Sequence, residues 1–370
     1  MSRQKVLQQV VGLTLIGLFF AGCGAPAATS APPTDTPIPP TETVTPIPAT
    51  DTPAPTATTS PTATSTPTSM PTMTATPAPQ LWDRKTSMPT ARYSLSTSVV
   101  DGKIYAIGGM GGLTVVEEYD PATDTWTRKA DMPTGRGFLS TSVVDGKIYA
   151  MGGNDSWWGA SLAAVEMYDP ATDTWTKKAD MTTPRDWFTT SVVNGKIYAM
   201  GGDVLEDGTG QRPYTTLRSV EEYDPATNTW TTKADMGRVR RAFHSVVVDD
   251  KIYALGSFSP YDEMYDPETD TWEKIAPMPS SRMGAPASVV NGKIYVFGGE
   301  EEKLGPPTSV VYEYDPETDT WAILPDMPYE AFYMSSSVVD GKVYIIGGSE
   351  EVYPRPEPHL STVWEYIPQP

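Results

Sequence analysis

The chain has 370 residues, a net charge of −19 at pH 7, one cysteine and two histidines. Such an acidic protein repels nucleic acid and anionic membrane surfaces, so we expect neither as a direct partner. One cysteine excludes an intrachain disulfide, and the few Cys and His residues put a zinc centre built from them out of reach.

Residues 1–22 have the layout of an export signal peptide. Arg3 and Lys5 form a basic start, and the apolar stretch that follows is too short for a comfortable membrane span. The segment ends in Phe20-Ala21-Gly22-Cys23, which resembles a bacterial lipobox with Phe in place of the usual Leu. The resemblance implies lipid attachment at Cys23, and hence an exported protein anchored on the extracytoplasmic side of a bacterial membrane or at the cell surface. The alternative is an ordinary signal peptide with an incidental cysteine.

Residues 23–80 are predicted to be a disordered linker that begins with the anchor cysteine. Residues 24–80 contain 15 Pro and 18 Thr and have almost nothing to bury in a core. Proline favours the polyproline II conformation, so we expect a semi-rigid spacer of about 3.1 Å per residue, reaching at most roughly 175 Å.

Residues 81–370 are predicted to form one folded domain, which is long enough for a sizeable core. The domain contains 25 Lys and Arg against 43 Asp and Glu, so the acidity belongs to it and not to the linker. Within it, adjacent glycines recur after a Lys-Ile/Val-Tyr strand. They are Gly108-Gly109, Gly152-Gly153, Gly201-Gly202, Gly298-Gly299 and Gly347-Gly348, with Gly256-Ser257 in the fourth copy.

Each of the first five copies continues with Tyr-Asp-Pro and then a tryptophan. The tryptophans are Trp126, Trp175, Trp230, Trp272 and Trp321, at spacings of 49, 55, 42 and 49 residues. A repeat of this length predicts stacked supersecondary units. In the sixth copy the turn reads Tyr366-Ile367-Pro368, and no tryptophan strand follows it.

One repeat, residues 92–127, predicts a four-stranded antiparallel blade. A β-prone run leads into Asp101-Gly102, a two-residue hairpin turn with both φ angles positive. The run Lys103-Ile104-Tyr105-Ala106-Ile107 is apolar on both faces, as a strand buried between neighbouring sheets must be. The glycine pair ends this strand where a Cβ atom does not fit, and a third strand and a short strand opened by Trp126 complete the unit.

These motifs resemble the kelch repeat, which has the same glycine pair, tyrosine and tryptophan. The resemblance extends over about 290 of the 370 residues in six copies. It implies an all-β, six-bladed kelch-type β-propeller with four antiparallel strands per blade. The fourth copy departs from the pattern with Asp249-Asp250 and a shortened loop, but it keeps Tyr265 and Trp272 and is counted as a blade.

The two ends of the domain predict how the ring closes. The sixth copy lacks its tryptophan strand, and an orphan copy of that strand, Trp82 to Pro89, precedes the first repeat. We therefore expect the strand of Trp82 to complete the last blade, which removes exposed sheet edges. We expect a monomer.

Strand alternation places the loops between second and third strands and the blade-to-blade connections on one side, the loop face. Five connections carry an arginine nine residues before the hairpin turn, and the sixth carries Ala331. The arginines are Arg92, Arg136, Arg185, Arg240 and Arg282. If they converge at the central mouth, they favour a carboxylate or another anion. The alternative is architectural, since arginine at this place is common in the kelch repeat and ties loops together.

The long loops of the loop face are the other candidate sites, because function on a repeated scaffold usually lies in loops that differ between repeats. Trp157 and Trp158 suit stacking on a sugar or grasping a peptide, or they cap the local core. Tyr214 and Tyr353 lie in two further loops. The loop that starts with Glu300-Glu301-Glu302 is expected to be solvated, or paired with the arginines.

Catalysis finds little support in this sequence, and we expect no catalytic residue, no cofactor and no metal. The domain lacks the cysteine that a copper-radical oxidase resembling galactose oxidase, another kelch propeller, would need for its Tyr–Cys cross-link. No Gly-x-Ser-x-Gly nucleophile elbow occurs. His244 is expected on the inner strand of blade four as a single hydrogen-bonded histidine.

The sequence therefore predicts a membrane-tethered extracytoplasmic module that binds a protein, peptide or glycan through its loop face. One alternative is a small-molecule enzyme at the central mouth, of the sialic-acid mutarotase or epimerase type. The resemblance implies it because some extracytoplasmic kelch propellers are such enzymes, and they use an acid/base group and an arginine. Fold analogy alone does not establish this activity. The other alternative is a structural protein of the envelope.

Overall fold

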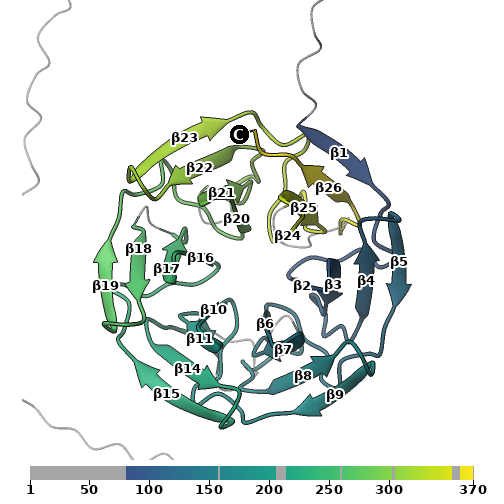
Figure 1. Ribbon diagram of the computed structural model, residues 1–370, viewed down its shortest axis with the longest axis vertical. Helices are drawn as coiled ribbons and strands as arrows, with labels where there is room; N and C mark the ends of the chain where they lie inside the picture. The colour runs from purple at the N-terminus through teal and green to yellow at the C-terminus, as the bar shows by residue number, and fades with distance from the viewer. Residues whose placement is uncertain are drawn as a thin grey trace, which may run out of the picture. The chain divides into compact units, whose positions relative to one another are not determined.

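The computed structural model describes residues 81–156, 159–205, 214–258, 261–301, 305–351 and 359–369. These residues form six four-stranded antiparallel sheets that surround a central axis as blades (Figure 1). The predicted all-β, six-bladed propeller is confirmed. None of the described residues forms a helix of the length and apolar character needed to cross a membrane.

Each of the first three blades is a meander of four strands that runs from the inner to the outer strand. Blade 1 consists of β2 (Ser96–Val100), β3 (Lys103–Ile107), β4 (Val116–Asp120) and β5 (Thr125–Arg128). Blade 2 consists of β6 (Ser140–Val144), β7 (Lys147–Met151), β8 (Val165–Asp169) and β9 (Thr174–Lys177). Blade 3 consists of β10 (Thr189–Val193), β11 (Lys196–Met200), β14 (Val220–Asp224) and β15 (Thr229–Lys233). A separate small hairpin in its long loop joins β12 (Asp203–Val204) and β13 (Thr215–Thr216).

The remaining three blades follow the same order. Blade 4 consists of β16 (His244–Val248), β17 (Lys251–Leu255), β18 (Glu263–Asp266) and β19 (Thr271–Lys274). Blade 5 consists of β20 (Ala287–Val290), β21 (Lys293–Phe297), β22 (Val311–Asp315) and β23 (Thr320–Leu324). Blade 6 consists of β24 (Ser335–Val339), β25 (Lys342–Ile346), β26 (Val363–Tyr366) and β1 (Trp82–Lys85).

The turn and glycine signals of the repeat have the conformations that the sequence predicts. Asp101 and Gly102 have φ angles of 50° and 72°, as a type I′ hairpin turn requires. Gly108 has a φ of 67°, and a Cβ atom there would lie 2.5 Å from the Arg136 carbonyl oxygen of the next blade. The glycine pair therefore lets neighbouring blades approach closely. Between the turn and the glycines, four of the five β3 residues are buried.

The ring closes through β1, as predicted from the orphan tryptophan segment. β1 pairs antiparallel with β26 in a register that places Trp82 opposite Tyr366. The Trp82 ring lies 4.7 Å from the Tyr366 ring and 6.0 Å from Phe297 in the neighbouring blade 5. The first strand of the domain thus completes the last blade and packs against the blade before it (Figure 1).

Hydroxyl groups join most of the inner strands to one another around the axis. In blade 2, Thr141 Oγ1 accepts a hydrogen bond of 2.8 Å from Ser98 and lies 2.9 Å from the Ser96 hydroxyl. Equivalent contacts join the other neighbouring blades among the described residues, except blades 4 and 5. There His244, Val246 and Ala287 stand at the hydroxyl positions, so no hydroxyl pair joins these two blades.

Candidate functional site at the mouth of the loop face

The five repeat arginines lie inside their own blades and do not line the mouth. Each is at most 2% exposed. Arg136, for example, donates to the carbonyl oxygens of Gly152, Ala164 and Ala150 at 3.1, 2.7 and 3.2 Å. It also forms a 2.8 Å ion pair with the buried Glu166. The guanidiniums therefore do not converge, and the geometry favours the architectural alternative.

The exceptions to this pattern support a structural role for the arginine. Arg92, Arg185 and Arg240 pair with Glu117, Glu221 and Glu263 in the same way. In blade 5, Tyr312 stands in the glutamate position, and Arg282 contacts its hydroxyl at 3.1 Å and Glu301 at 2.6 Å. In blade 6 both partners are replaced, by Ala331 and Trp364, and Trp364 stacks on Tyr329. Blade 6 thus lacks both members of the pair, whereas blade 5 keeps the arginine and gives it two other partners, as expected if a buried arginine must always be paired.

A ring of six equivalent residues surrounds the mouth, one from each blade and each two positions after the arginine slot. They are Ser94, Phe138, Trp187, Ala242, Gly284 and Tyr333, with φ angles between 49° and 60°. Each backbone N–H donates to the carbonyl oxygen of the ring residue in the preceding blade, at 2.8–3.2 Å. This closed circle of hydrogen bonds holds bulky residues in the left-handed region, which they rarely adopt without such support.

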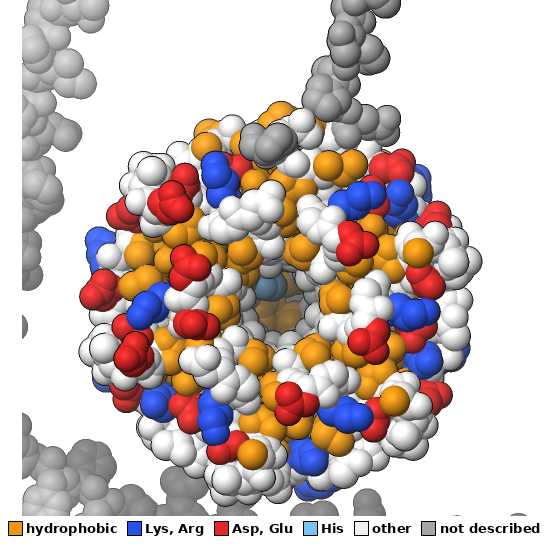
Figure 2. All heavy atoms as spheres, viewed as in Figure 1, with side chains coloured by type: hydrophobic (Ala, Val, Ile, Leu, Met, Phe, Trp, Pro, Cys, Tyr) orange, Lys and Arg blue, Asp and Glu red, His pale blue; other side chains and the backbone are white. Residues whose placement is uncertain are grey.

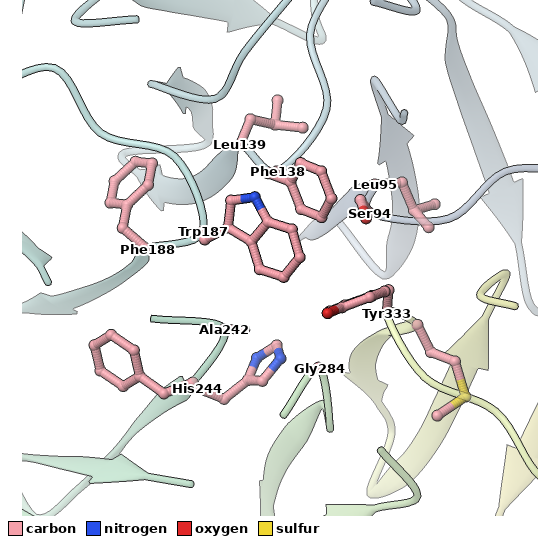
Figure 3. Close-up of a pocket in the computed structure, with 12 residues that line it drawn as sticks. Ser94, Leu95, Phe138, Leu139, Trp187, Phe188, Ala242, His244, Gly284 and Tyr333 are labelled. Atoms are coloured by element: carbon pink, nitrogen blue, oxygen red, sulfur yellow. The ribbon is translucent and has the colours of Figure 1, made fainter. Parts of the chain in front are cut away.

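Aromatic side chains from this ring cover part of a hollow at the axis. Phe138 stacks on Trp187 with 4.0 Å between ring centroids, and Tyr333 meets Trp187 edge to face at 5.1 Å. Trp187 and Tyr333 are only partly buried. In Figure 3 the Trp187, Tyr333 and His244 side chains point toward one opening, whereas Ala242 and Gly284 leave their side of it uncovered. The hollow has a volume of about 430 Å³, including the solvent at its opening.

His244 lies at the start of the inner strand β16, as expected, but its environment differs from the expectation. Its side chain forms no hydrogen bond with any residue that the structure describes, because the hydroxyl contacts stop at the seam between blades 4 and 5. Burial lowers the pKa of His244 to about 4. The imidazole is therefore neutral at physiological pH and adds polar but uncharged surface to the hollow.

A layer of buried polar residues lies beside the ring on blades 2, 3 and 4. The Asn154 amide donates to the Asp186 carboxylate at 2.8 Å. Arg241 forms a 2.6 Å ion pair with Asp203, whose other carboxylate oxygen accepts from Thr216 at 2.7 Å. All of these residues except Thr216 are at most 6% exposed. Such a network positions charge directly behind the aromatic mouth.

Asp186 is a carboxyl group of this layer whose proton affinity is raised by its surroundings. Burial raises the pKa of Asp186 to about 7, and the nearby Asp203 carboxylate adds to the rise. Hydrogen bonding to Asn154 and Ser161 and the charge of Arg241 act in the opposite direction. Asp186 Oδ1 has no hydrogen bond of good geometry within the described part of the chain, although Ser161 lies close enough to affect the pKa. A carboxyl group of this kind exchanges a proton near neutral pH.

Arg241, which belongs to none of the repeat motifs, is the arginine that contacts aromatic residues at the mouth. Its guanidinium carbon lies 4.2 Å from the Tyr214 ring, 4.7 Å from Phe258 and 5.6 Å from Trp187. Arg241 follows the repeat arginine Arg240, at a slot where the other blades have Tyr, Gly, Asp, Met and Phe. That departure from the repeat was the available signal in the sequence.

Some of the other predicted site residues lie in the described part of the chain and some lie outside it. Tyr214 reaches the mouth through its contact with Arg241. The glutamate loop is expected from the sequence to be solvated or paired with the arginines. Glu301 pairs with the repeat arginine Arg282, whereas Glu300 is 2% exposed and therefore not solvated. The remaining predicted residues lie outside the described part of the chain. They are Trp157, Trp158, Tyr353 and Cys23.

The described residues offer no group of three His, Cys, Asp or Glu side chains arranged to hold a metal ion. On the face shown in Figure 2, acidic and basic side chains are spread over the rim, and hydrophobic side chains surround a central hollow. The chemical capacity of the mouth therefore lies in aromatic surface, one buried ion pair and one carboxyl group with a raised pKa.

Comparison with known proteins agrees with this architecture. The family model described as the KLHDC2/KLHL20/DRC7 Kelch-repeats domain matches residues 83–257, and the Kelch motif matches residues 263–279, 281–328 and 331–369. Among solved structures, the chain is similar to the one titled "Structure of YjhT", with a TM-score of 0.65 and 18% identity over 75% of this chain and 95% of that chain. No curated protein matches the sequence. Because the two family models together cover most of the propeller, this chain belongs to the kelch-repeat family.

Proposed function

We propose that the protein is a membrane-tethered extracytoplasmic binding module that recognises a protein, peptide or glycan at the mouth of its loop face. The observation that carries this proposal is the half-buried pair Trp187 and Tyr333 beside an open hollow. A partly exposed aromatic pair offers a large apolar surface to a sugar ring or an apolar side chain. The hydrogen-bonded ring fixes these side chains in advance, which lowers the entropy cost of binding.

The binding test uses the full chain against arrays of glycans and of synthetic peptides, followed by calorimetric titration of each positive compound. We expect Trp187→Ala and Tyr333→Ala each to weaken binding at least about tenfold. Trp126→Phe, on the outer strand β5, is the matched control and should bind normally. A compound that binds both mouth variants as tightly as the wild type would remove the mouth from the proposal.

The tether requires its own test, because it rests on Cys23 and the linker. Mass spectrometry of the mature protein should find a lipid-modified N-terminal Cys23, and Cys23→Ala should release the protein from the membrane fraction. A wild-type protein that stays soluble after export would contradict the anchor and leave the binding proposal intact.

The second candidate function is a small-molecule enzyme at the same mouth, acting on an acidic sugar. Asp186 favours it, because a carboxyl group that titrates near neutral pH next to Arg241 suits general acid–base chemistry. The assay follows interconversion of N-acetylneuraminate anomers by NMR. Turnover that Asp186→Asn abolishes would make the enzyme the primary function. Anomer exchange at the uncatalysed rate would exclude it for this substrate.

A further inference from the structure

Blade 4 departs from the other blades on the loop face in two neighbouring segments. Its connection reads Gly237-Arg238-Val239, where blades 1 and 2 have Pro89-Thr90-Ala91 and Pro133-Thr134-Gly135. In those blades the threonine hydroxyl donates to the glutamate that pairs with the repeat arginine, at 2.8 Å in both cases. In blades 3 and 4 a backbone N–H makes the equivalent contact, from Thr182 to Glu221 at 2.9 Å and from Gly237 to Glu263 at 3.0 Å. The next residue, Arg238, stands where blades 1 and 2 have the threonine, and its side chain is exposed.

Two exposed cations flank one tyrosine on this blade. The Arg238 guanidinium lies 4.5 Å from the centre of the Tyr261 ring, and Lys274 Nζ lies 5.4 Å from it. Neither Arg238 nor Lys274 forms an ion pair with a residue that the structure describes. Among the described Lys and Arg residues, only Arg84 and Lys178 share this property. Two of these four cations therefore meet at a single aromatic ring, in a domain with a large excess of acidic residues.

The same two segments of blade 4 also carry two exposed apolar side chains. Val239 is 56% exposed and Phe258 is 42% exposed, and they are two of the four large hydrophobic residues that are exposed in the described structure. Phe258 also lies 4.7 Å from the Arg241 guanidinium, which joins the surface to the mouth. We call the set Lys274, Tyr261, Arg238, Val239 and Phe258 the blade-4 strip. Its members range from Lys274, at the end of the outer strand β19, to Phe258 beside Arg241.

We propose that the blade-4 strip binds an acidic segment of a partner protein that carries an apolar or aromatic side chain. Charge complementarity selects the acidic partner, because Arg238 and Lys274 have no carboxylate partner among the described residues. Stacking on Tyr261 holds the two cations in place, so less side-chain entropy is lost on binding. Glu263, which lies opposite Lys274 on β18, is already paired with Arg240, and at physiological salt the screening length of about 8 Å weakens the effect of charges farther away.

The apolar residues select a protein over an acidic polysaccharide. Phe258 could also stack on a sugar ring, but the aliphatic Val239, 56% exposed beside Arg238, is matched by an apolar peptide side chain and not by the hydroxyl groups of a polysaccharide. A polyanion would instead need a longer row of cations than the two present in the strip. The inference shares with the proposed function only the idea that ligands bind on the loop face. It does not depend on the ring at the mouth, because the strip and the ring have no residue in common.

Fluorescence anisotropy of labelled synthetic peptides with the full chain tests this inference. The probe is a 12-residue peptide with glutamates on both sides of a central phenylalanine, compared with versions that carry Gln for Glu or Ser for Phe. We expect each replacement to weaken binding at least tenfold. Arg238→Ala with Lys274→Ala, and separately Val239→Ser with Phe258→Ser, should do the same while the melting temperature is unchanged. Lys178→Ala, which removes an unpaired cation outside the strip, is the matched control and should bind like the wild type.

The outcomes separate this inference from the proposed function. If Trp187→Ala loses glycan or peptide ligands while the acidic probe still binds through the strip, both proposals stand as two sites. No binding of the probe, or binding that survives the Arg238/Lys274 double variant, overturns the inference. Polygalacturonate is the polysaccharide control. If it binds as tightly as the peptide probe, and if this binding depends on Arg238 and Lys274 but not on Val239 and Phe258, the partner is a polysaccharide and the proposed protein partner is wrong.

Discussion

The buried ion pair of blade 2 gives the most direct test of the architectural role of the repeat arginines. Arg136 is fully buried and holds three carbonyl oxygens as well as Glu166, which is 6% exposed. Replacement of Arg136 by Met preserves much of the side-chain volume but leaves the Glu166 carboxylate without its cation. Thr134 then remains as a donor to Glu166, at 2.8 Å. One hydroxyl does not compensate a buried charge.

The expected cost follows from the burial of this pair. Removing one partner of a buried ion pair typically costs about 3–5 kcal/mol, because the other charge stays desolvated. For a domain of this size that corresponds to a decrease in melting temperature of roughly 5–10 °C. The Arg136→Met/Glu166→Met double variant removes both charges and should regain at least about 1 kcal/mol relative to the sum of the single changes. Blade 6, with Ala331 and Trp364, shows that the fold accepts the loss of both partners.

Chemical denaturation and thermal melting of the single and double variants measure these quantities. The control is Lys147→Met, which removes the surface ion pair with Asp169 and should change stability by no more than about 1 kcal/mol. If Arg136→Met melts like the wild type, the buried pair is not a source of stability. If it also loses a mouth ligand while remaining equally stable, the arginine serves the ligand, and the architectural interpretation is refuted.

Two further predictions concern the ring closure and the pH dependence of stability. Trp82→Ala removes the contacts of β1 with Tyr366 and Phe297 and should lower the free energy of unfolding by about 2–3 kcal/mol. This is less than for a fully buried tryptophan because Trp82 is partly exposed. An unchanged melting temperature would contradict closure of the ring by β1. Burial raises the pKa of Asp186 from 3.8 to about 7, so the folded state binds a proton that the unfolded chain has released, and this residue lowers stability as pH rises from about 4 to 7. Asp186→Asn should remove up to about 4 kcal/mol of that pH dependence, and parallel denaturation midpoints for the two proteins across this range would disprove the shift.

Most of the fold could be predicted from the sequence because its signals are local and repeated. Asp101-Gly102 requires positive φ angles, and the Gly108-Gly109 pair allows a close approach of the next blade, wherever these residues lie in space. The orphan strand of Trp82 and the incomplete sixth copy each lack a partner, so their pairing follows from counting the strands. Blade 4 stays a blade despite Asp249-Asp250, since both aspartates adopt the positive φ angles that the turn needs.

The candidate site could be assembled only from the tertiary structure. The regular spacing of the repeat arginines locates their backbone, but only the packed blade shows that a guanidinium such as that of Arg136 turns inward to Glu166. Asp186 and Asp203 belong to the third repeat, Asn154 to the second and Arg241 to the fourth, and only the placement of these blades side by side makes them one network. The repeated sequence pattern specifies the backbone conformation of each blade. The direction of a side chain and its contacts with other blades depend instead on which residues are buried in the assembled ring and on which desolvated charges must be paired there.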